Sequence, residues 1–246
     1  MVRIALISDI HSNEVALRAV LAEIRRTGAD QIVCLGDVAT LGPRPKAVIE
    51  ILGELDCPCI MGNHDEFLLD PDLVHTYSEA PPRVIASIDW SRSCLSAIEL
   101  GFLRGFERRR EVPLGRNSTL QLFHGSPRSN MEYIVASTSP ESLDEMLGGI
   151  TATVLAGGHT HFQMVRQHHG DLVINPGSVG MPFKDYVGGS ATILSHAEYA
   201  TIEEVDGTIN VSLKRIPLDK DALRQAQRET EHPLGALAAA AVWMNR

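Results

Sequence analysis

The N-terminal part of the chain alternates short apolar runs with amphipathic segments, and this order constrains the fold more than any other feature. Val2–Ser8, Gln31–Leu35 and Pro58–Met61 are mostly apolar and have the length of buried strands. Asn13–Arg26 and Lys46–Leu55 carry apolar residues at helical spacing. Because a β-α-β-α-β order brings successive strands together through crossover helices, we predict an α/β fold with a mainly parallel sheet.

The rest of the chain predicts further strands and helices without a visible domain boundary. We expect one or two helices in Pro82–Phe106, helices over Ser139–Leu147 and Asp219–Glu229, and strands over Thr119–Phe123, Thr153–Ala156, Gln163–Gln167, Leu172–Ile174, Ala191–Ser195 and on both sides of Asp206-Gly207. His168 and His169 are interpreted as a polar hairpin tip and not as a third metal site. With no repeat or low-complexity linker, we predict one domain over 1–246, with 231–246 as a candidate C-terminal tail.

Cysteine content and net charge exclude several classes of protein. The four cysteines form no C-x-x-C motif, which predicts reduced thiols and a cytoplasmic location. The longest apolar stretch, Leu234–Met244, is shorter than the roughly 20 residues that cross a bilayer, so we expect no membrane association. The net charge of −9 and the lack of a basic, aromatic-studded stretch disfavour a long nucleic acid as partner.

Polar clusters follow the predicted strands, each at the point where a strand ends. The clusters are Asp9-Ile10-His11, Gly36-Asp37, Gly62-Asn63-His64-Asp65, His124-Gly125 and Gly158-His159-Thr160-His161. Because the carboxyl ends of parallel strands share one edge of a sheet, these side chains can converge on one place. Their oxygen and nitrogen donors suit Mn, Fe, Zn or Ni. Taken singly, each cluster has an ordinary alternative, such as a helix cap at Asp9 or a turn at Gly36, but the ordered set favours a metal site.

This ordered set resembles the calcineurin-like metallophosphoesterase superfamily, in particular its small bacterial and archaeal phosphodiesterase-type branch. The resemblance runs from Arg3 to about Gly180 and includes the segment Asn175-Pro176-Gly177-Ser178. It implies a four-layer αββα sandwich of two mixed β-sheets. It also implies two divalent metal ions, whose identity among Mn, Fe, Zn and Ni the sequence leaves open.

The resemblance also implies which residues bind the metals. The first ion would take Asp9, His11, Asp37 and His161, and the second would take Asp37, Asn63, His124 and His159. Asp37 would then bridge the two ions, because a shared carboxylate partly neutralises two adjacent cations.

The predicted reaction is hydrolysis of a phosphate ester by a hydroxide that bridges the two ions. By resemblance, His64 donates a proton or a hydrogen bond to the leaving oxygen, and Asn63 and His64 contact the substrate. The sequence allows two interpretations of Asp65: it orients His64, or it caps the following helix.

Departures from the family pattern bear on the substrate. The segment Val38–Pro43 lacks the arginine that is typical of protein phosphatases in this superfamily, and Thr40 stands where that branch has a carboxylate that pairs with the catalytic histidine. Arg44 or Arg128 could supply the missing charge, although solvated loop arginines are the simpler interpretation. We therefore expect a phosphodiester or a small nucleotide-type phosphate ester as substrate. The alternatives are a phosphomonoesterase or protein phosphatase of the same superfamily, and a non-catalytic scaffold with the same fold.

Overall fold

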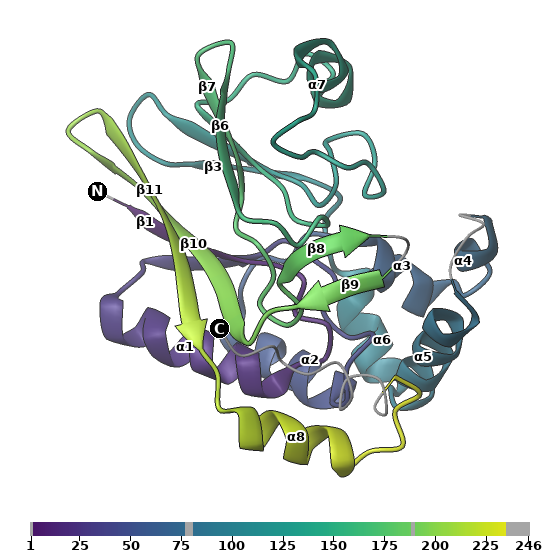
Figure 1. The fold of residues 1–246 in the computed structure, drawn as a ribbon. Coiled ribbons are helices and arrows are strands. Elements are labelled where there is room, and N and C mark those ends of the chain that lie inside the picture. Colours follow the sequence, from purple (N-terminus) through teal and green to yellow (C-terminus); the bar gives the residue numbers. More distant parts are fainter. Residues whose placement is uncertain (1, 77–80, 188–189, 235–246) are drawn as a thin grey trace.

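Two mixed β-sheets lie face to face in the computed structural model, which describes residues 2–76, 81–187 and 190–234 (Figure 1). The first sheet has the order β11-β10-β1-β2, formed by Thr208–Pro217, His196–Val205, Arg3–Ile7 and Gln31–Cys34. The second has the order β3-β4-β5-β7-β6, formed by Arg110–Pro113, Thr119–Leu122, Val154–Ala156, Asp171–Asn175 and Met164–His168. A separate hairpin pairs β8 (Phe183–Val187) with β9 (Ser190–Ile193).

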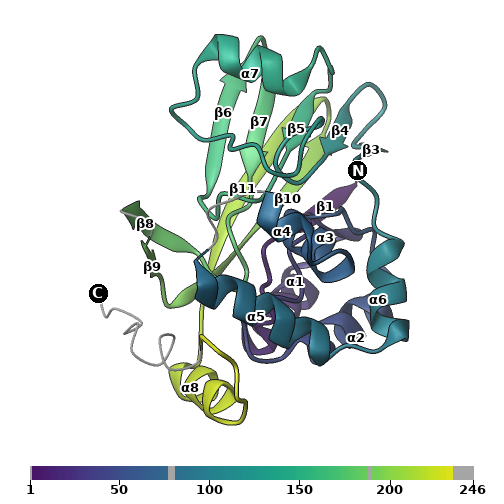
Figure 2. The same cartoon turned by 90° about the vertical axis from the view of Figure 1, so that its right-hand side faces the viewer.

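The helices cover the outer faces of the two sheets. They are α1 (Glu14–Thr27), α2 (Pro45–Leu55), α3 (Asn63–Leu69), α4 (Leu73–Thr76), α5 (Pro82–Ser93), α6 (Ala97–Arg104), α7 (Pro140–Leu147) and α8 (Lys220–Arg228). Figure 2 shows α7 on the side of the second sheet, far from α1 and α2. None of the helices in the described ranges is long and apolar enough to cross a membrane.

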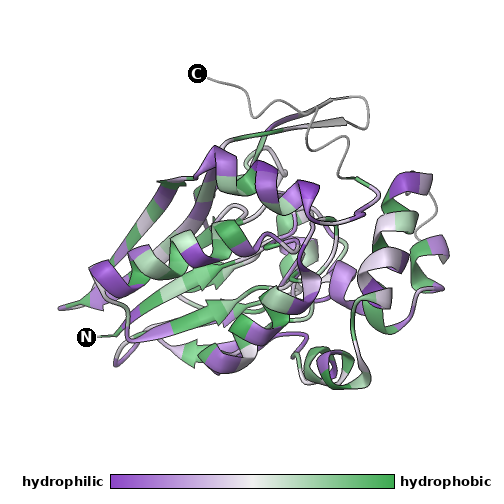
Figure 3. Cartoon of the chain, turned by 90° about the horizontal axis from the view of Figure 1, so that it is seen from below, coloured by the Kyte–Doolittle hydropathy of each residue, from purple (hydrophilic) through white to green (hydrophobic). Residues whose placement is uncertain are grey.

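The alternation of side chains along β1 separates two of the layers. Ile4 and Leu6 lie in the apolar cluster between the sheets, whereas Ala5 and Ile7 lie in the cluster that also contains the buried face of α1. Because successive side chains of a strand point to opposite faces, one strand contributes to both cores. Seen from below, the helices carry hydrophilic and hydrophobic stripes (Figure 3), as amphipathic covering helices do.

The second sheet repeats this arrangement on its own two faces. Val154 and Ala156 of β5 pack between the sheets, while Leu155 packs in a third cluster with Leu143 and Leu147 of α7. The layers therefore run helix, sheet, sheet, helix, which confirms the predicted αββα sandwich. The prediction of a mainly parallel sheet is wrong for the first sheet, because β1 pairs parallel with β2 only, while β10 pairs antiparallel with both β1 and β11.

Several predicted elements have different boundaries in the structure. Pro58–Met61 is not a strand: only Cys59 and Ile60 form isolated bridges, because the chain turns into α3 soon afterwards. Pro82–Phe106 forms two helices, and Ser96 caps the second by accepting a hydrogen bond from the Ile98 N–H. The predicted ranges contain no counterpart of α4, β3 or β8, and α3 was implied only by the capping interpretation of Asp65. Residues 235–246 of the candidate tail lie outside the described residues.

Candidate metal centre

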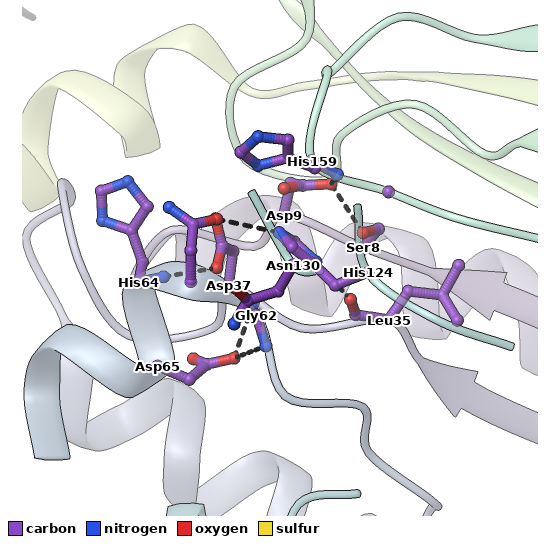
Figure 4. A network of polar contacts seen from close by, with 12 residues as sticks. Ser8, Asp9, Leu35, Asp37, Gly62, His64, Asp65, His124, Asn130 and His159 are labelled. Carbon is purple, nitrogen blue, oxygen red and sulfur yellow. Dashed lines mark hydrogen bonds and ion pairs between the residues drawn. The ribbon is translucent and has the colours of Figure 1, made fainter. Parts of the chain in front are cut away.

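Loops from both sheets meet at one edge of the sandwich, and they carry the polar clusters of the sequence. Asp9 and His11 follow β1, Asp37 follows β2, His124 follows β4, and His159 follows β5. Figure 4 shows Asp9, Asp37, His124 and His159 gathered there from these separate loops. The structure thus brings together side chains that lie far apart in the sequence.

Asp9, His11 and His161 form the first group of candidate ligands. One ligand atom from each lies within 4.8 Å of the others. The Nε2 atoms of His11 and His161 are 3.0 Å apart, and Nε2 of His161 is 3.4 Å from Oδ1 of Asp9. All three side chains are buried, so few water molecules compete for these donor atoms.

Asp37, His124 and His159 form the second group, again with ligand atoms within 4.8 Å. Asn63 belongs beside them, because its Oδ1 is 3.2 Å from Nε2 of His124. Asp37 Oδ2 is 3.4 Å from Nε2 of His124 and 3.9 Å from Nε2 of His11 in the first group. The Asp37 carboxylate therefore lies between the two groups, where a bridging ligand would have to be.

The outward nitrogens of the histidines hold their rings in place. Nδ1 of His124 donates to the carbonyl of Leu35 at 2.6 Å, and Nδ1 of His161 donates to the carbonyl of Met181 at 2.7 Å. A carbonyl oxygen only accepts, so Nδ1 carries a proton and Nε2 is the ring nitrogen that faces the site. Nδ1 of His11 lies 3.3 Å from the hydroxyl of Thr40, so the structure pairs Thr40 with this candidate ligand.

Several buried polar atoms at the site have no hydrogen-bond partner, among them Oδ1 of Asp9 and Nε2 of His159. A buried polar atom without a partner costs about 1–3 kcal/mol, and a cation between these groups would remove that cost. Burial and the nearby positive charge of His124 lower the pKa of His159 to about 3, which leaves its imidazole neutral, as metal binding requires. The residues present fit a pair of divalent ions that favour nitrogen and oxygen ligands.

The backbone at the site adopts a conformation that side-chain-bearing residues rarely take. The residues with positive φ include five candidate ligands: Asp9 (53°), His11 (47°), Asp37 (58°), His159 (67°) and His161 (61°). This left-handed region is unfavourable for residues with a Cβ and is concentrated at functional sites in proteins. The local strain therefore supports a functional role for these loops.

Close approach of backbone segments explains the glycine at position 62. A Cβ at Gly62 would lie 2.1 Å from Oδ1 of Asp37 and 2.5 Å from its backbone nitrogen. Only a residue without a side chain allows the loop after β2 to approach the start of α3 so closely.

Asp65 holds these two segments together. Its buried carboxylate accepts hydrogen bonds from the backbone N–H groups of Asp37 (2.8 Å), Val38 (2.9 Å) and Gly62 (3.0 Å). Burial and the Asp37 carboxylate raise the pKa of Asp65 to about 7. These contacts match the helix-capping interpretation, and they extend it, since Asp65 also fixes the position of Asp37.

His64 lies at the edge of the candidate centre. Its backbone N–H donates to Oδ1 of Asp37 at 2.9 Å, and its ring stands edge-on to His11 with centroids 5.2 Å apart. Its Nδ1 is buried without a hydrogen-bond partner, and burial lowers the pKa of the ring. A polar ring atom is therefore available beside the two groups.

The two candidate arginines have carboxylate partners. Arg128 pairs with Glu132 at 2.6 Å and with Glu145 at 3.2 Å. Arg44 pairs with Glu14 at 2.7 Å and also with Glu229. Both arginines are therefore engaged with carboxylates of this chain.

Two aromatic side chains at the site were missed by sequence reasoning. Tyr133 packs on the ring of His159 with centroids 4.5 Å apart, and Phe183 stacks on His161 at 4.3 Å. Both lie outside the polar clusters, so no sequence signal placed them here. The segment after β7 also contacts the site, because the Ser178 hydroxyl donates a hydrogen bond to the Asp9 carbonyl at 2.7 Å.

Comparisons with known proteins show the family and the fold of the chain. The family model of the calcineurin-like phosphoesterase superfamily domain matches residues 2–198. The uncharacterized protein MJ0912 of Methanocaldococcus jannaschii is 28% identical over 225 residues, covering 85% of each chain. The crystal structure of a metallophosphoesterase from Sphaerobacter thermophilus is similar with a TM-score of 0.74 and 27% identity, covering 98% of this chain and 99% of the other. The hypothetical protein PH1004 of Pyrococcus horikoshii shares the fold, with a TM-score of 0.79, 20% identity and coverage of 98% and 97%.

The fold and the candidate ligands thus define a metallophosphoesterase-like protein. The chain belongs to the calcineurin-like phosphoesterase superfamily.

Proposed function

We propose that this protein is a phosphoesterase that uses two divalent metal ions to hydrolyse phosphodiesters or small nucleotide-type phosphate esters. The observation that carries the proposal is the position of Asp37 Oδ2, 3.4 Å from Nε2 of His124 and 3.9 Å from Nε2 of His11. One carboxylate oxygen thereby faces both groups of candidate ligands. When bound, two such ions would supply the Lewis acidity that activates water and neutralises phosphoryl oxygens.

The protein's own residues prepare this reaction by fixing positions. Asp65 holds the backbone of Asp37, so the bridging carboxylate needs little rearrangement. The carbonyls of Leu35 and Met181 orient the rings of His124 and His161. We assign His64 the role of proton or hydrogen-bond donor to the leaving oxygen, because its ring lies against that of His11 and its Nδ1 has no hydrogen-bond partner. Asn63 and His64 are the proposed substrate contacts.

Charge supports a small substrate. The chain carries a net charge of −9, which repels long polyanions over most of the surface. Bound cations would reverse the sign of the charge locally, so a small phosphate ester could bind there. The four free cysteines fit a reducing compartment, and on this ground we place the enzyme in the cytoplasm.

Hydrolysis assays on metal-free and reconstituted protein test this proposal. After chelation and addition of Mn²⁺, Fe²⁺, Zn²⁺ or Ni²⁺ singly, we expect hydrolysis of bis-p-nitrophenyl phosphate to exceed that of p-nitrophenyl phosphate. The exposed variant Asp89→Asn serves as the matched control for Asp37→Asn. Absence of metal-dependent hydrolysis of both esters and of a nucleotide panel would favour the scaffold alternative, and a preference for monoesters would favour a phosphomonoesterase.

A further inference from the structure

The hairpin between β6 and β7 ends in a two-residue turn with an unusual first residue. His168 pairs with Asp171, so His169 and Gly170 form the connection. Both have positive φ, 50° and 98°, as a type I′ turn requires. Asparagine or aspartate usually occupies the first position of such a turn, and here it is a histidine.

The turn brings two imidazoles together. In a continuous strand the side chains of consecutive residues would point to opposite faces. Instead, the ring centroids of His168 and His169 are 4.2 Å apart. The left-handed backbone at His169 thus places two metal-binding side chains on the same side of the hairpin.

A carboxylate from another element completes the cluster. Oδ1 of Asp144 on α7 lies 2.7 Å from Nε2 of His168 and 2.8 Å from Nε2 of His169. His168 is buried, whereas Asp144 and His169 are exposed, so an ion can enter and keep water ligands.

We infer that Asp144, His168 and His169 form a binding site for a divalent transition-metal cation, separate from the candidate metal centre. Two imidazoles and one carboxylate are ligands that Zn²⁺, Ni²⁺ and Cu²⁺ accept. One ligand atom from each residue lies within 4.8 Å of the others, close enough for small side-chain rotations to place them around one ion. The sequence alone favoured a polar hairpin tip without a metal, and the structure adds Asp144, which lies 24 residues before His168.

The site is distant from the candidate metal centre, and it connects α7 with the hairpin of β6 and β7. The catalytic loop carrying His161 precedes β6, and the turn at His169 lies at the other end of this five-residue strand, about 15 Å away by strand geometry. Figures 1 and 2 show this turn next to α7 and far from α3. A bound ion would tie α7 to the hairpin and raise the thermal stability of the protein.

The variant His169→Asn tests the inference without disturbing the turn, since asparagine tolerates positive φ and favours a type I′ turn. Wild-type and variant proteins are stripped with a chelator, titrated with Zn²⁺ by calorimetry, and measured for bound zinc by elemental analysis. We expect the variant to bind one zinc ion fewer per chain and to show a smaller zinc-dependent rise in Tm. The same change at the exposed His75 is the matched control and should leave the stoichiometry unchanged.

A second background separates this site from the catalytic proposal. When His169→Asn is added to the Asp37→Asn variant, the zinc content should still fall by one ion per chain, because the two sites share no residue. The result that would overturn the inference is equal zinc stoichiometry in wild type and His169→Asn, with imidazole NMR signals of His168 unmoved by Zn²⁺. That result would leave Asp144 as a hydrogen-bond partner only.

Discussion

Nε2 of His11 and Nε2 of His161 lie 3.0 Å apart, although 150 residues separate the two histidines in the chain. Nδ1 of His161 donates to the Met181 carbonyl, so Nε2 is the ring nitrogen that faces His11. Two nitrogen atoms at this distance in a buried site need a proton or a cation between them. We propose that a cation bound by both histidines and by Asp9 accounts for the short distance and for the Asp9 oxygen without a hydrogen bond.

Replacing Asp37 should abolish activity and reduce metal content. Asp37→Asn keeps the size of the side chain but removes the charge that lies between the two groups. We expect kcat to fall by about 10³-fold or more, and the bound metal per chain to decrease. Elemental analysis and a hydrolysis assay measure both effects. Full activity with an unchanged metal content would contradict the bridging role.

His64→Ala should separate turnover from metal binding. If His64 acts on the leaving oxygen, kcat falls by about 10²–10⁴-fold while the metal content stays at the wild-type value. The effect should be smaller for an ester whose leaving group is a good one, because a good leaving group needs no proton. Equal losses for good and poor leaving groups would count against proton donation, and wild-type kcat would rule out the role.

Asp65→Asn should lower stability and, through Asp37, activity. An amide retains one acceptor oxygen and directs an NH₂ group at backbone donors, so at least one of three buried hydrogen bonds is lost. We expect the free energy of unfolding to fall by about 1–3 kcal/mol, measured by urea denaturation. The exposed variant Asp89→Asn is the control. If both variants unfolded at the same urea concentration, the bracing role of Asp65 would be wrong.

Gly62→Ala and Gly53→Ala should have opposite effects. The new Cβ at position 62 would lie 2.1 Å from Asp37 Oδ1, which must move and weaken metal binding. At position 53, in α2, the Cβ meets nothing within 4 Å, so alanine should stabilise the helix by about 0.5–1 kcal/mol. Thermal unfolding and metal content together distinguish the two variants. Retention of metal by Gly62→Ala would show that the loops tolerate the added atom.

Acidification should destabilise the protein partly through His232. This ring contacts the Ser87 hydroxyl at 2.8 Å, and burial lowers its pKa from the ordinary 6.5 to about 4. Below about pH 6.5 His232 therefore takes up a proton in the unfolded chain but stays neutral in the folded chain. The contribution of the neutral ring to the free energy of unfolding is present above that pH and is lost toward pH 4.

His232→Gln isolates this contribution from that of the other histidines. The stability of wild type relative to the variant should decrease by about 1–2 kcal/mol between pH 7.5 and pH 5, as measured by urea denaturation. A difference that does not change with pH would mean that His232 is not buried as a neutral ring.

The convergence of the polar clusters could be predicted because most of them follow a strand at one sheet edge, as Asp9 follows β1 and Asp37 follows β2, whereas their roles as ligands came from the family resemblance. The hydrogen bonds of Asp65 to Asp37 and Val38 could not be predicted from the sequence, because they join backbone groups 28 and 27 residues away. Strand β3 was missed because Arg110–Pro113 has little apolar character and is stabilised by pairing with β4. The positions of Tyr133 and Phe183 likewise follow from loop conformation, which local sequence patterns do not specify.

Anomalous diffraction from crystals of the Mn²⁺-loaded protein tests the central claim most directly. We predict two manganese peaks about 3.5–4 Å apart, one beside Asp9, His11 and His161, the other beside Asn63, His124 and His159, with Asp37 contacting both. A single peak at this edge of the sandwich, or two peaks that do not share Asp37, would contradict the dinuclear centre.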